Sequence, residues 1–189
     1  MKCYTEKEIK SCGSPCERLL ITAFAKNPAL FSEYPLHESD FSREKDLFRT
    51  LKLLLDEGYQ KINDAIFLSG YRFLTAVEKN YELNDQDVYN RTSEFKQMFC
   101  KNDEFALENT MVYYNDVKKY SLLRDGMGRG IDVSPYYVPY IPNNKENNKK
   151  YYEAKHRLRL TSLEILQRTF QSEKQTFRMA REPKDTTEE

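Results

Sequence analysis

Three glycines within five residues are the first feature of this sequence that could do chemistry. The segment RDGMGRG (124–130) contains Gly126, Gly128 and Gly130, and glycine-rich loops bind phosphate through their backbone N–H groups. Such loops follow a strand and precede a helix, whereas this one follows a predicted helix, and the sequence has no GxxxxGK[ST] pattern. We therefore interpret these glycines as a helix end, where the left-handed conformation suits glycine, and we expect no ATP binding or hydrolysis.

Other residue types that could support catalysis or metal binding lack a suitable spacing. The four cysteines are Cys3, Cys12, Cys16 and Cys100, and neither His37 nor His156 lies at a zinc-finger distance from them. The acidic pairs are Asp56 with Glu57, Asp85 with Asp87, and Asp103 with Glu104. They fall at predicted helix ends and turns, where acidic residues serve as caps and solvated charges. We predict free thiols and no catalytic, metal-binding or cofactor-binding residues.

A cluster of tyrosines close to Lys149 and Lys150 is the strongest candidate for a binding surface. Its members are Tyr136, Tyr137, Tyr140, Tyr151 and Tyr152. Aromatic side chains interleaved with lysine can stack on single-stranded bases. Tyrosines also pack proline-rich loops and are enriched at protein interfaces. Because the surrounding charge is not strongly positive, we favour packing and contact with a protein partner.

The overall composition argues against a protein whose main partner is nucleic acid or a membrane. Lysine and arginine number 30, as do aspartate and glutamate, so no net charge attracts phosphates. Apolar runs are far shorter than the ~20 residues that span a bilayer, and the N-terminal sequence lacks the apolar stretch of a signal peptide. We expect a cytoplasmic protein with reduced thiols and no membrane contact.

Helical patterns dominate the first hundred residues. Segment 16–24 is a short apolar helix, and segment 43–57 has leucines on one face, with Ser42 placed to cap it and Gly58 placed to end it. Residues 62–80 predict one broken helix or two short ones around Gly70, and a further helix covers 85–99. We predict an all-α chain that begins with a compact bundle of five or six short helices.

The remaining residues predict a long antiparallel helical hairpin. One helix follows residue 104, and a second extends from about Glu146 to Phe170, with a proline-rich segment between them. The expected organisation is a flexible arm at 1–16, a helical bundle at 17–103, a hairpin at 104–170, and a linker or cut tail at 171–189. A hairpin beside a small bundle leaves apolar surface exposed, and such surface is usually an interface.

We therefore expect a homodimer through the hairpins, which could build a ring. The residues expected near this contact are Tyr113, Val117, Tyr120, Leu158 and Ile165. Some of these five must instead form the seam inside the hairpin, and the pattern does not distinguish them.

Two parts of the chain combine several motifs in a fixed order. The first, 17–60, has a short apolar helix, then NPALF (27–31), LHESDF (36–41), and a helix with the pair Leu47-Phe48 that ends in LLLDEG. The second, 107–168, contains VYYNDVKKYSLLRDGMGRG and KHRLRLTSLEILQ. Both parts resemble the N-terminal domain of DnaB-type replicative helicases, and the second falls where that family has its hairpin. The cysteine-rich start, residues 61–100 and the long tyrosine-rich turn depart from the family pattern.

The resemblance implies a non-catalytic collar domain whose hairpins pair into a trimer of dimers and which binds primase. Its partners would be other copies of itself, a primase or other replisome protein, and the helicase motor domain, with little direct DNA binding. The ATP-binding motor would follow in a longer chain. An alternative is a free-standing phage or mobile-element adaptor that loads, regulates or inhibits a replicative helicase. A helical regulator that binds nucleic acid is a third possibility.

Overall fold

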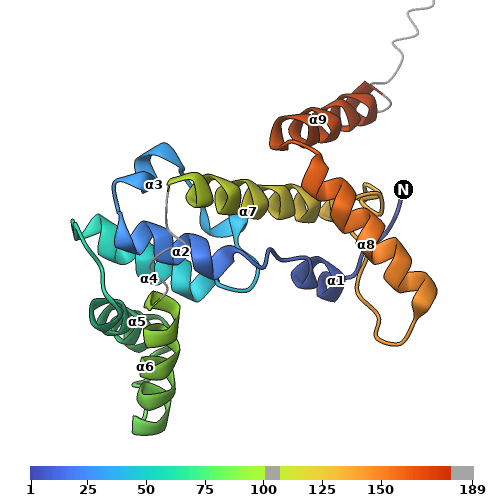
Figure 1. The fold of residues 1–189 in the computed structure, drawn as a ribbon. Helices are drawn as coiled ribbons and strands as arrows, with labels where there is room; N and C mark the ends of the chain where they lie inside the picture. Colours follow the sequence, from blue (N-terminus) through green and yellow to red (C-terminus); the bar gives the residue numbers. More distant parts are fainter. Residues whose placement is uncertain (101–106, 180–189) are drawn as a thin grey trace, which may run out of the picture. The chain divides into compact units, whose positions relative to one another are not determined.

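The computed structural model describes residues 1–100 and 107–179, with only the backbone for residues 107 and 172–179. Every regular element in these ranges is helical, which confirms the predicted all-α class (Figure 1). The elements are α1 (Glu6–Ser11), α2 (Glu17–Lys26), α3 (Leu30–Glu33), the 3-10 turn η1 (Glu38–Asp40), α4 (Lys45–Asp56), α5 (Asp64–Lys79), α6 (Asp85–Phe99), α7 (Leu107–Gly128), α8 (Lys145–Leu160) and α9 (Leu163–Met179).

The chain divides into two compact units, and the division falls within α7. One unit is Lys10–Ser121, which we call the bundle, and the other comprises Met1–Ile9 and Leu122–Glu189. The first part of α7 belongs to the bundle because its Val117 is fully buried in the bundle core. The expected boundary at 103/104 and the pair Asp103–Glu104 lie outside the described residues. An antiparallel hairpin over 104–170 stays a prediction.

Aromatic side chains fill the core of the bundle, where α4 packs against α2 and α5, and α6 packs against α2 and α5. Phe41 stacks on Phe48 with 4.5 Å between ring centroids. Phe67 of α5 meets the edge of Phe95 of α6 at 5.0 Å. These rings bury large apolar areas in favourable offset and edge-on geometries, so they hold the short helices together.

A buried glutamate binds the segment just before α4, and the predicted cap, Ser42, does not cap the helix. The Glu17 side chain is 1% exposed, and it accepts hydrogen bonds from the backbone N–H groups of Ser42, Arg43 and Glu44 at 2.7, 3.0 and 3.1 Å. The Ser42 hydroxyl donates to the Lys10 carbonyl instead. The prediction for Ser42 was wrong because the helix starts three residues later, at Lys45. A carboxylate from α2 binds the N–H groups of the segment that leads into it.

Gly58 ends α4 and Gly130 ends α7, as predicted, whereas Gly126 and Gly128 lie within the last turns of α7. Gly58 and Gly130 have φ of +86° and +76°. After α7, the N–H of Gly130 donates to the Met127 carbonyl and the N–H of Ile131 donates to the Gly126 carbonyl. An equivalent pair of bonds follows α4. This Schellman arrangement satisfies the last carbonyls of a helix and requires a left-handed residue.

Helix α5 is continuous, so the predicted break around Gly70 is wrong. A Cβ atom at Gly70 would lie 3.2 Å from the side chain of Leu54. The glycine therefore lets α4 and α5 approach closely without ending the helix. The helix begins at Asn63, whose side chain accepts from the Ile66 N–H, and ends at Asn80, which is left-handed with φ of 52°.

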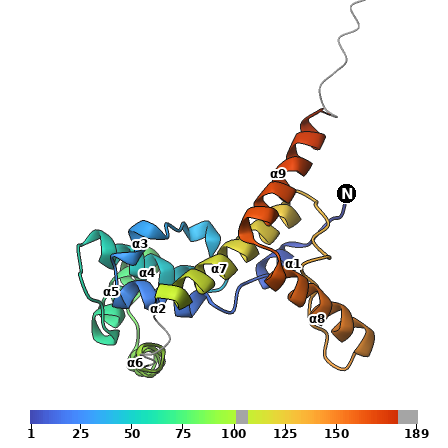
Figure 2. The same cartoon turned by 45° about the horizontal axis from the view of Figure 1, so that its top comes forward.

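The predicted helix over 146–170 is also wrong, because two helices, α8 and α9, occupy this segment (Figures 1 and 2). Thr161 has an extended backbone with ψ of 125°. The Ser162 hydroxyl then accepts from the N–H of Ile165 at 3.2 Å, which caps α9. A β-branched residue followed by serine suits this interruption, because serine competes with the helical backbone and stabilises a new N-terminus.

Both ends of the chain are more structured than the sequence indicated. In the expected arm 1–16, α1 forms and Cys12 is fully buried. In the expected tail 171–189, α9 continues to Met179, while residues 180–189 lie outside the described residues. Residues 171–179 contain no glycine or proline, and their glutamate, lysine, glutamine, arginine and methionine favour helix.

Candidate protein-docking site

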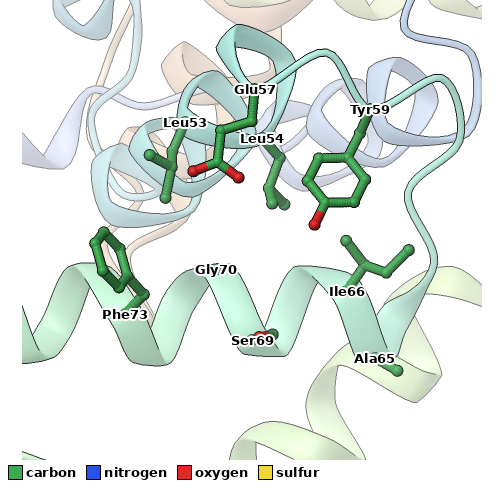
Figure 3. Close-up of a pocket in the computed structure, with 9 residues that line it drawn as sticks. All are labelled: Leu53, Leu54, Glu57, Tyr59, Ala65, Ile66, Ser69, Gly70 and Phe73. Carbon is green, nitrogen blue, oxygen red and sulfur yellow. The ribbon is translucent and has the colours of Figure 1, made fainter.

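An apolar groove lies between α4 and α5 in the bundle. The close contact of Gly70 with Leu54 brings the two helices together at its floor. The cavity is about 430 Å³ and opens to solvent. Its lining residues are Leu53, Leu54, Glu57, Tyr59, Ala65, Ile66, Ser69, Gly70 and Phe73 (Figure 3). We call this hollow the α4–α5 groove.

Two polar groups stand at the α4 side of the groove. In Figure 3 the Glu57 carboxylate and the Tyr59 hydroxyl extend toward α5. Within the described part of the chain, neither side chain has a hydrogen-bond or ion-pair partner. A carboxylate beside an apolar surface can pair with a basic side chain of a partner, and that pairing would orient the partner in the groove.

The apolar wall on α5 is unusually exposed. Phe73 is 57% exposed and Val77, one turn further along, is 63% exposed. Together with Ile66, these residues have the spacing i, i+7 and i+11, which places them on one side of α5. The buried side of α5 carries Phe67 and Tyr71 instead. Ile66 still packs against the bundle core, whereas Phe73 and Val77 are apolar side chains of α5 that the bundle leaves exposed.

A second hollow, of about 440 Å³, lies beside Leu36 and Phe48 and differs in its charges. Arg49 at its rim binds Glu38 at 2.5 Å and Glu78 at 3.3 Å. The hydrogen bond from Arg49 lowers the pKa of Glu38. The charged groups of this hollow are already paired, so we select the α4–α5 groove as the docking site.

The five residues expected at an oligomer contact differ in burial. Val117 is fully buried in the bundle core and Leu158 is 3% exposed, so neither is available for another chain in this conformation. Tyr113 and Tyr120 are half-buried. Ile165 is 53% exposed. Of the five, the two tyrosines and the isoleucine are accessible to a second copy.

The tyrosine cluster separates into a packed part and an exposed part. Tyr136 and Tyr137 are half-buried in the turn after Val133. Tyr151 is half-buried and meets the rings of Tyr140 and Tyr152 at 5.3 and 5.1 Å. Tyr140 and Tyr152 are 52% and 61% exposed. The structure thus brings three of the five tyrosines into contact and leaves two of these accessible.

The remaining candidates for chemistry occupy ordinary structural positions. No three His, Cys, Asp or Glu side chains form a metal-binding group in the ranges 1–100 and 107–179. Burial and the neighbouring Asp116 raise the pKa of Cys16 to about 12, so its thiol is protonated and unreactive at neutral pH. No helix within the described residues is long and apolar enough to cross a membrane.

Sequence reasoning missed the α4–α5 groove, although part of its signal was present. The apolar residues of 62–80 include Phe73 and Val77, which lie outside the side of α5 that the bundle buries. An apolar surface wider than one helical face was the available signal. Comparisons with protein-family models, with curated proteins and with solved structures find no match to this chain.

Proposed function

We propose that this chain is a non-catalytic docking and oligomerisation domain of a DnaB-type replicative helicase. The observation that carries the docking role is the α4–α5 groove, an open apolar hollow with exposed Phe73 and an unpaired Glu57 at its edge. The link to replicative helicases rests on the sequence resemblance. In such a protein the domain would bind partners while a separate motor domain hydrolyses ATP.

The residues that carry the resemblance have structural roles that are compatible with this proposal. Phe31 of NPALF meets Phe24 edge-on at 5.5 Å, and Phe41 of LHESDF stacks on Phe48. Asp40 is 5% exposed and accepts hydrogen bonds from Lys118 at 3.1 Å and Ser121 at 3.0 Å. These residues stabilise the bundle, so the sequence resemblance bears on the fold. Partner binding is assigned to the α4–α5 groove instead.

The proposed occupant of the groove is an amphipathic helix of a primase or another replisome protein. Its apolar side chains would cover Leu53, Ile66 and Phe73, and a lysine or arginine would pair with Glu57. A hollow of about 430 Å³ is in the range that binds a few large side chains. Recognition of an amphipathic helix by an apolar groove is a common mode of protein binding.

Self-association is the second part of the proposal, and it concerns the accessible members of the predicted contact. Tyr113, Tyr120 and Ile165 would contribute to a homodimer, and a ring of dimers would form the collar. Light scattering over a concentration series tests this part, and a strict monomer at hundreds of micromolar contradicts it.

The docking part is tested with the purified chain and the primase encoded in the same genome, by calorimetry. We expect micromolar or tighter binding, and Phe73→Glu should weaken it more than tenfold because a carboxylate would be buried against apolar surface. Tyr89→Glu is the matched control, since Tyr89 is 68% exposed on α6. Binding that survives Phe73→Glu would remove the groove from the proposal.

Charge complementarity is tested separately with Glu57→Lys. This variant should weaken the primase complex severalfold at low salt, whereas Glu33→Lys, at an exposed glutamate of α3, should not. If neither the primase nor the helicase motor domain binds the wild-type chain, the proposed function is wrong.

A further inference from the structure

One face of α8 combines positive charge with an exposed aromatic ring. The residues at positions i, i+4, i+7, i+11 and i+14 of this helix lie on the same side. They are Lys145, Lys149, Tyr152, His156 and Arg159, and all five are exposed. We call this surface the α8 basic face. It carries no acidic residue, because Glu146 and Glu153 occupy other positions around the helix.

The charge of α8 differs sharply from that of the whole chain. Six lysines or arginines and two glutamates lie within its 16 residues, whereas the 189 residues together have a formal net charge of zero. Fields at a surface depend on the nearest charges, because salt screens interactions beyond about 8–10 Å. A ligand at the α8 basic face therefore experiences a positive surface.

Two exposed tyrosines are linked to each other and to this face through a third tyrosine. Tyr152 lies midway along the face and is 61% exposed, and Tyr140 is 52% exposed. The half-buried Tyr151 contacts both rings, at 5.1 and 5.3 Å, and supports them from below. Lys155 lies 5.8 Å from the centre of the Tyr151 ring. This support restricts the two exposed tyrosines, so little freedom is lost when a ring stacks on them.

We propose that the α8 basic face binds single-stranded nucleic acid. Lys145, Lys149 and Arg159 contact phosphates, while Tyr152 and Tyr140 stack on unpaired bases. The helix is roughly 24 Å long at 1.5 Å per residue, which suits a site of about four nucleotides, the lower end of the range for single-strand binding folds. This inference is independent of the proposed helicase function and rests only on α8 and its tyrosines.

The arrangement favours a single strand over other ligands with negative charge. Duplex DNA keeps its bases stacked, so Tyr152 and Tyr140 would find no exposed base faces. An acidic protein would use the lysines but would gain little from two exposed rings. The sequence-based expectation of little direct DNA binding rested on the net charge of the whole chain, which averages this face with the acidic groups elsewhere.

Fluorescence anisotropy with a labelled 20-nucleotide oligothymidine and the full chain tests the proposal. Three phosphate contacts predict a slope of roughly −2 for log K against log salt. Tyr152→Ala should weaken binding about tenfold, the value expected for loss of one stacking contact. The double variant Lys145→Glu/Lys149→Glu should weaken it more and reduce the salt slope by more than one unit.

Two matched controls separate this face from general charge and exposure. Tyr89→Ala removes an equally exposed tyrosine from α6, and Lys61→Glu/Lys96→Glu makes the same charge change at exposed lysines of the bundle. Both should keep wild-type affinity within twofold, and circular dichroism should show native helix content for every variant.

Four outcomes would overturn the proposal. The first is no binding at 50 mM salt, and the second is equal loss of affinity in the α8 variants and their controls. The third is that Tyr152→Ala binds oligothymidine as tightly as the wild type, and that polyglutamate competes as well as unlabelled oligothymidine. That result would assign the face to an acidic protein. A duplex that binds as tightly as the single strand would likewise exclude stacking on unpaired bases.

Discussion

The α4–α5 groove and the α8 basic face are both exposed, and they are made in different ways. The groove exists because Gly70 allows two helices to meet at Leu54, and its walls come from α4, the loop at Tyr59, and α5. The α8 basic face is a property of one helix, whose sequence alone sets the spacing of its lysines and Tyr152. The first surface depends on tertiary packing and the second on helical periodicity.

The two surfaces also differ in the ligand that their chemistry suits. The groove is apolar with one unpaired carboxylate, so a partner helix with a basic residue complements it. The α8 basic face is cationic with exposed rings, so phosphates and bases complement it. A chain with zero net charge can therefore have one surface that suits a basic ligand and another that suits an acidic ligand. Substitutions in one surface should leave binding at the other unchanged.

The largest expected effect comes from Glu17→Ala. This variant removes the carboxylate that holds the segment before α4, the helix that forms one wall of the groove. The substitution leaves the partly buried backbone N–H groups of Ser42, Arg43 and Glu44 without their acceptor. We expect a loss of roughly 3 kcal/mol in the free energy of unfolding of the bundle, since each unsatisfied group costs about 1–3 kcal/mol. Urea titration followed by circular dichroism measures it.

Glu33→Ala, at an exposed glutamate, is the control for this variant and should change the stability by less than about 0.5 kcal/mol. Primase binding should be lost as the bundle unfolds. Oligothymidine binding should persist at urea concentrations at which α8 is still helical. Simultaneous loss of both activities at low urea would show that the two surfaces are not independent.

A smaller effect is expected from Gly70→Val, which changes the floor of the groove. A Cβ atom here lies 3.2 Å from Leu54, and a branched side chain would force α4 and α5 apart. We expect a loss of about 1–3 kcal/mol of stability, as for other overpacked sites, together with weaker primase binding. Gly128→Val is a control, since no atom lies within 4 Å of a Cβ there. Equal stability of the wild type and Gly70→Val would mean that the helices are not held at this contact.

Phe73→Glu and Tyr152→Ala should separate the two surfaces when each variant is tested against both ligands. Phe73→Glu should lose about tenfold or more in primase affinity and keep its affinity for oligothymidine within twofold. Tyr152→Ala should show the reverse, because the two residues lie in different compact units. Calorimetry and anisotropy on the same preparations provide the four affinities. A single variant that weakens both ligands would argue for one shared surface.

The smallest effect concerns pH and reports on the bundle alone. Burial and Asp116 raise the pKa of Cys16 from its ordinary value of 9.0 to about 12. Between these values the unfolded thiol loses its proton and the folded thiol keeps it, so stability falls as the pH rises above 9. Because Cys16 is only half-buried, we expect less than about 1 kcal/mol at pH 9.5.

Cys16→Ala should remove this part of the pH dependence, so the stability difference between wild type and variant should shrink from pH 7 to pH 9.5. Oligothymidine binding by the variant should equal that of the wild type at both values. A constant stability difference across this range would show that the thiol is not shielded from solvent.

The sequence determined the elements whose signals are local. Helix α6 has the predicted bounds of 85–99, and Gly58 and Gly130 end their helices with positive φ, because a left-handed residue is set by the chain around it. The all-α class follows from the helical periodicity of the apolar residues. The α8 basic face was also present in the sequence, as lysines and tyrosines at helical spacing.

Tertiary structure decided everything that depends on residues far apart in the chain. The segment before α4 is held by Glu17, which lies about 25 residues earlier in the chain, and the hydroxyl of the local candidate Ser42 binds elsewhere. The sequence alone predicts a helix break at Gly70, whereas the structure shows that this glycine makes room for the side chain of Leu54. The groove follows from the same contact: a sequence shows which side chains are apolar, but only the packing of α4 on α5 determines which of them remain in contact with water.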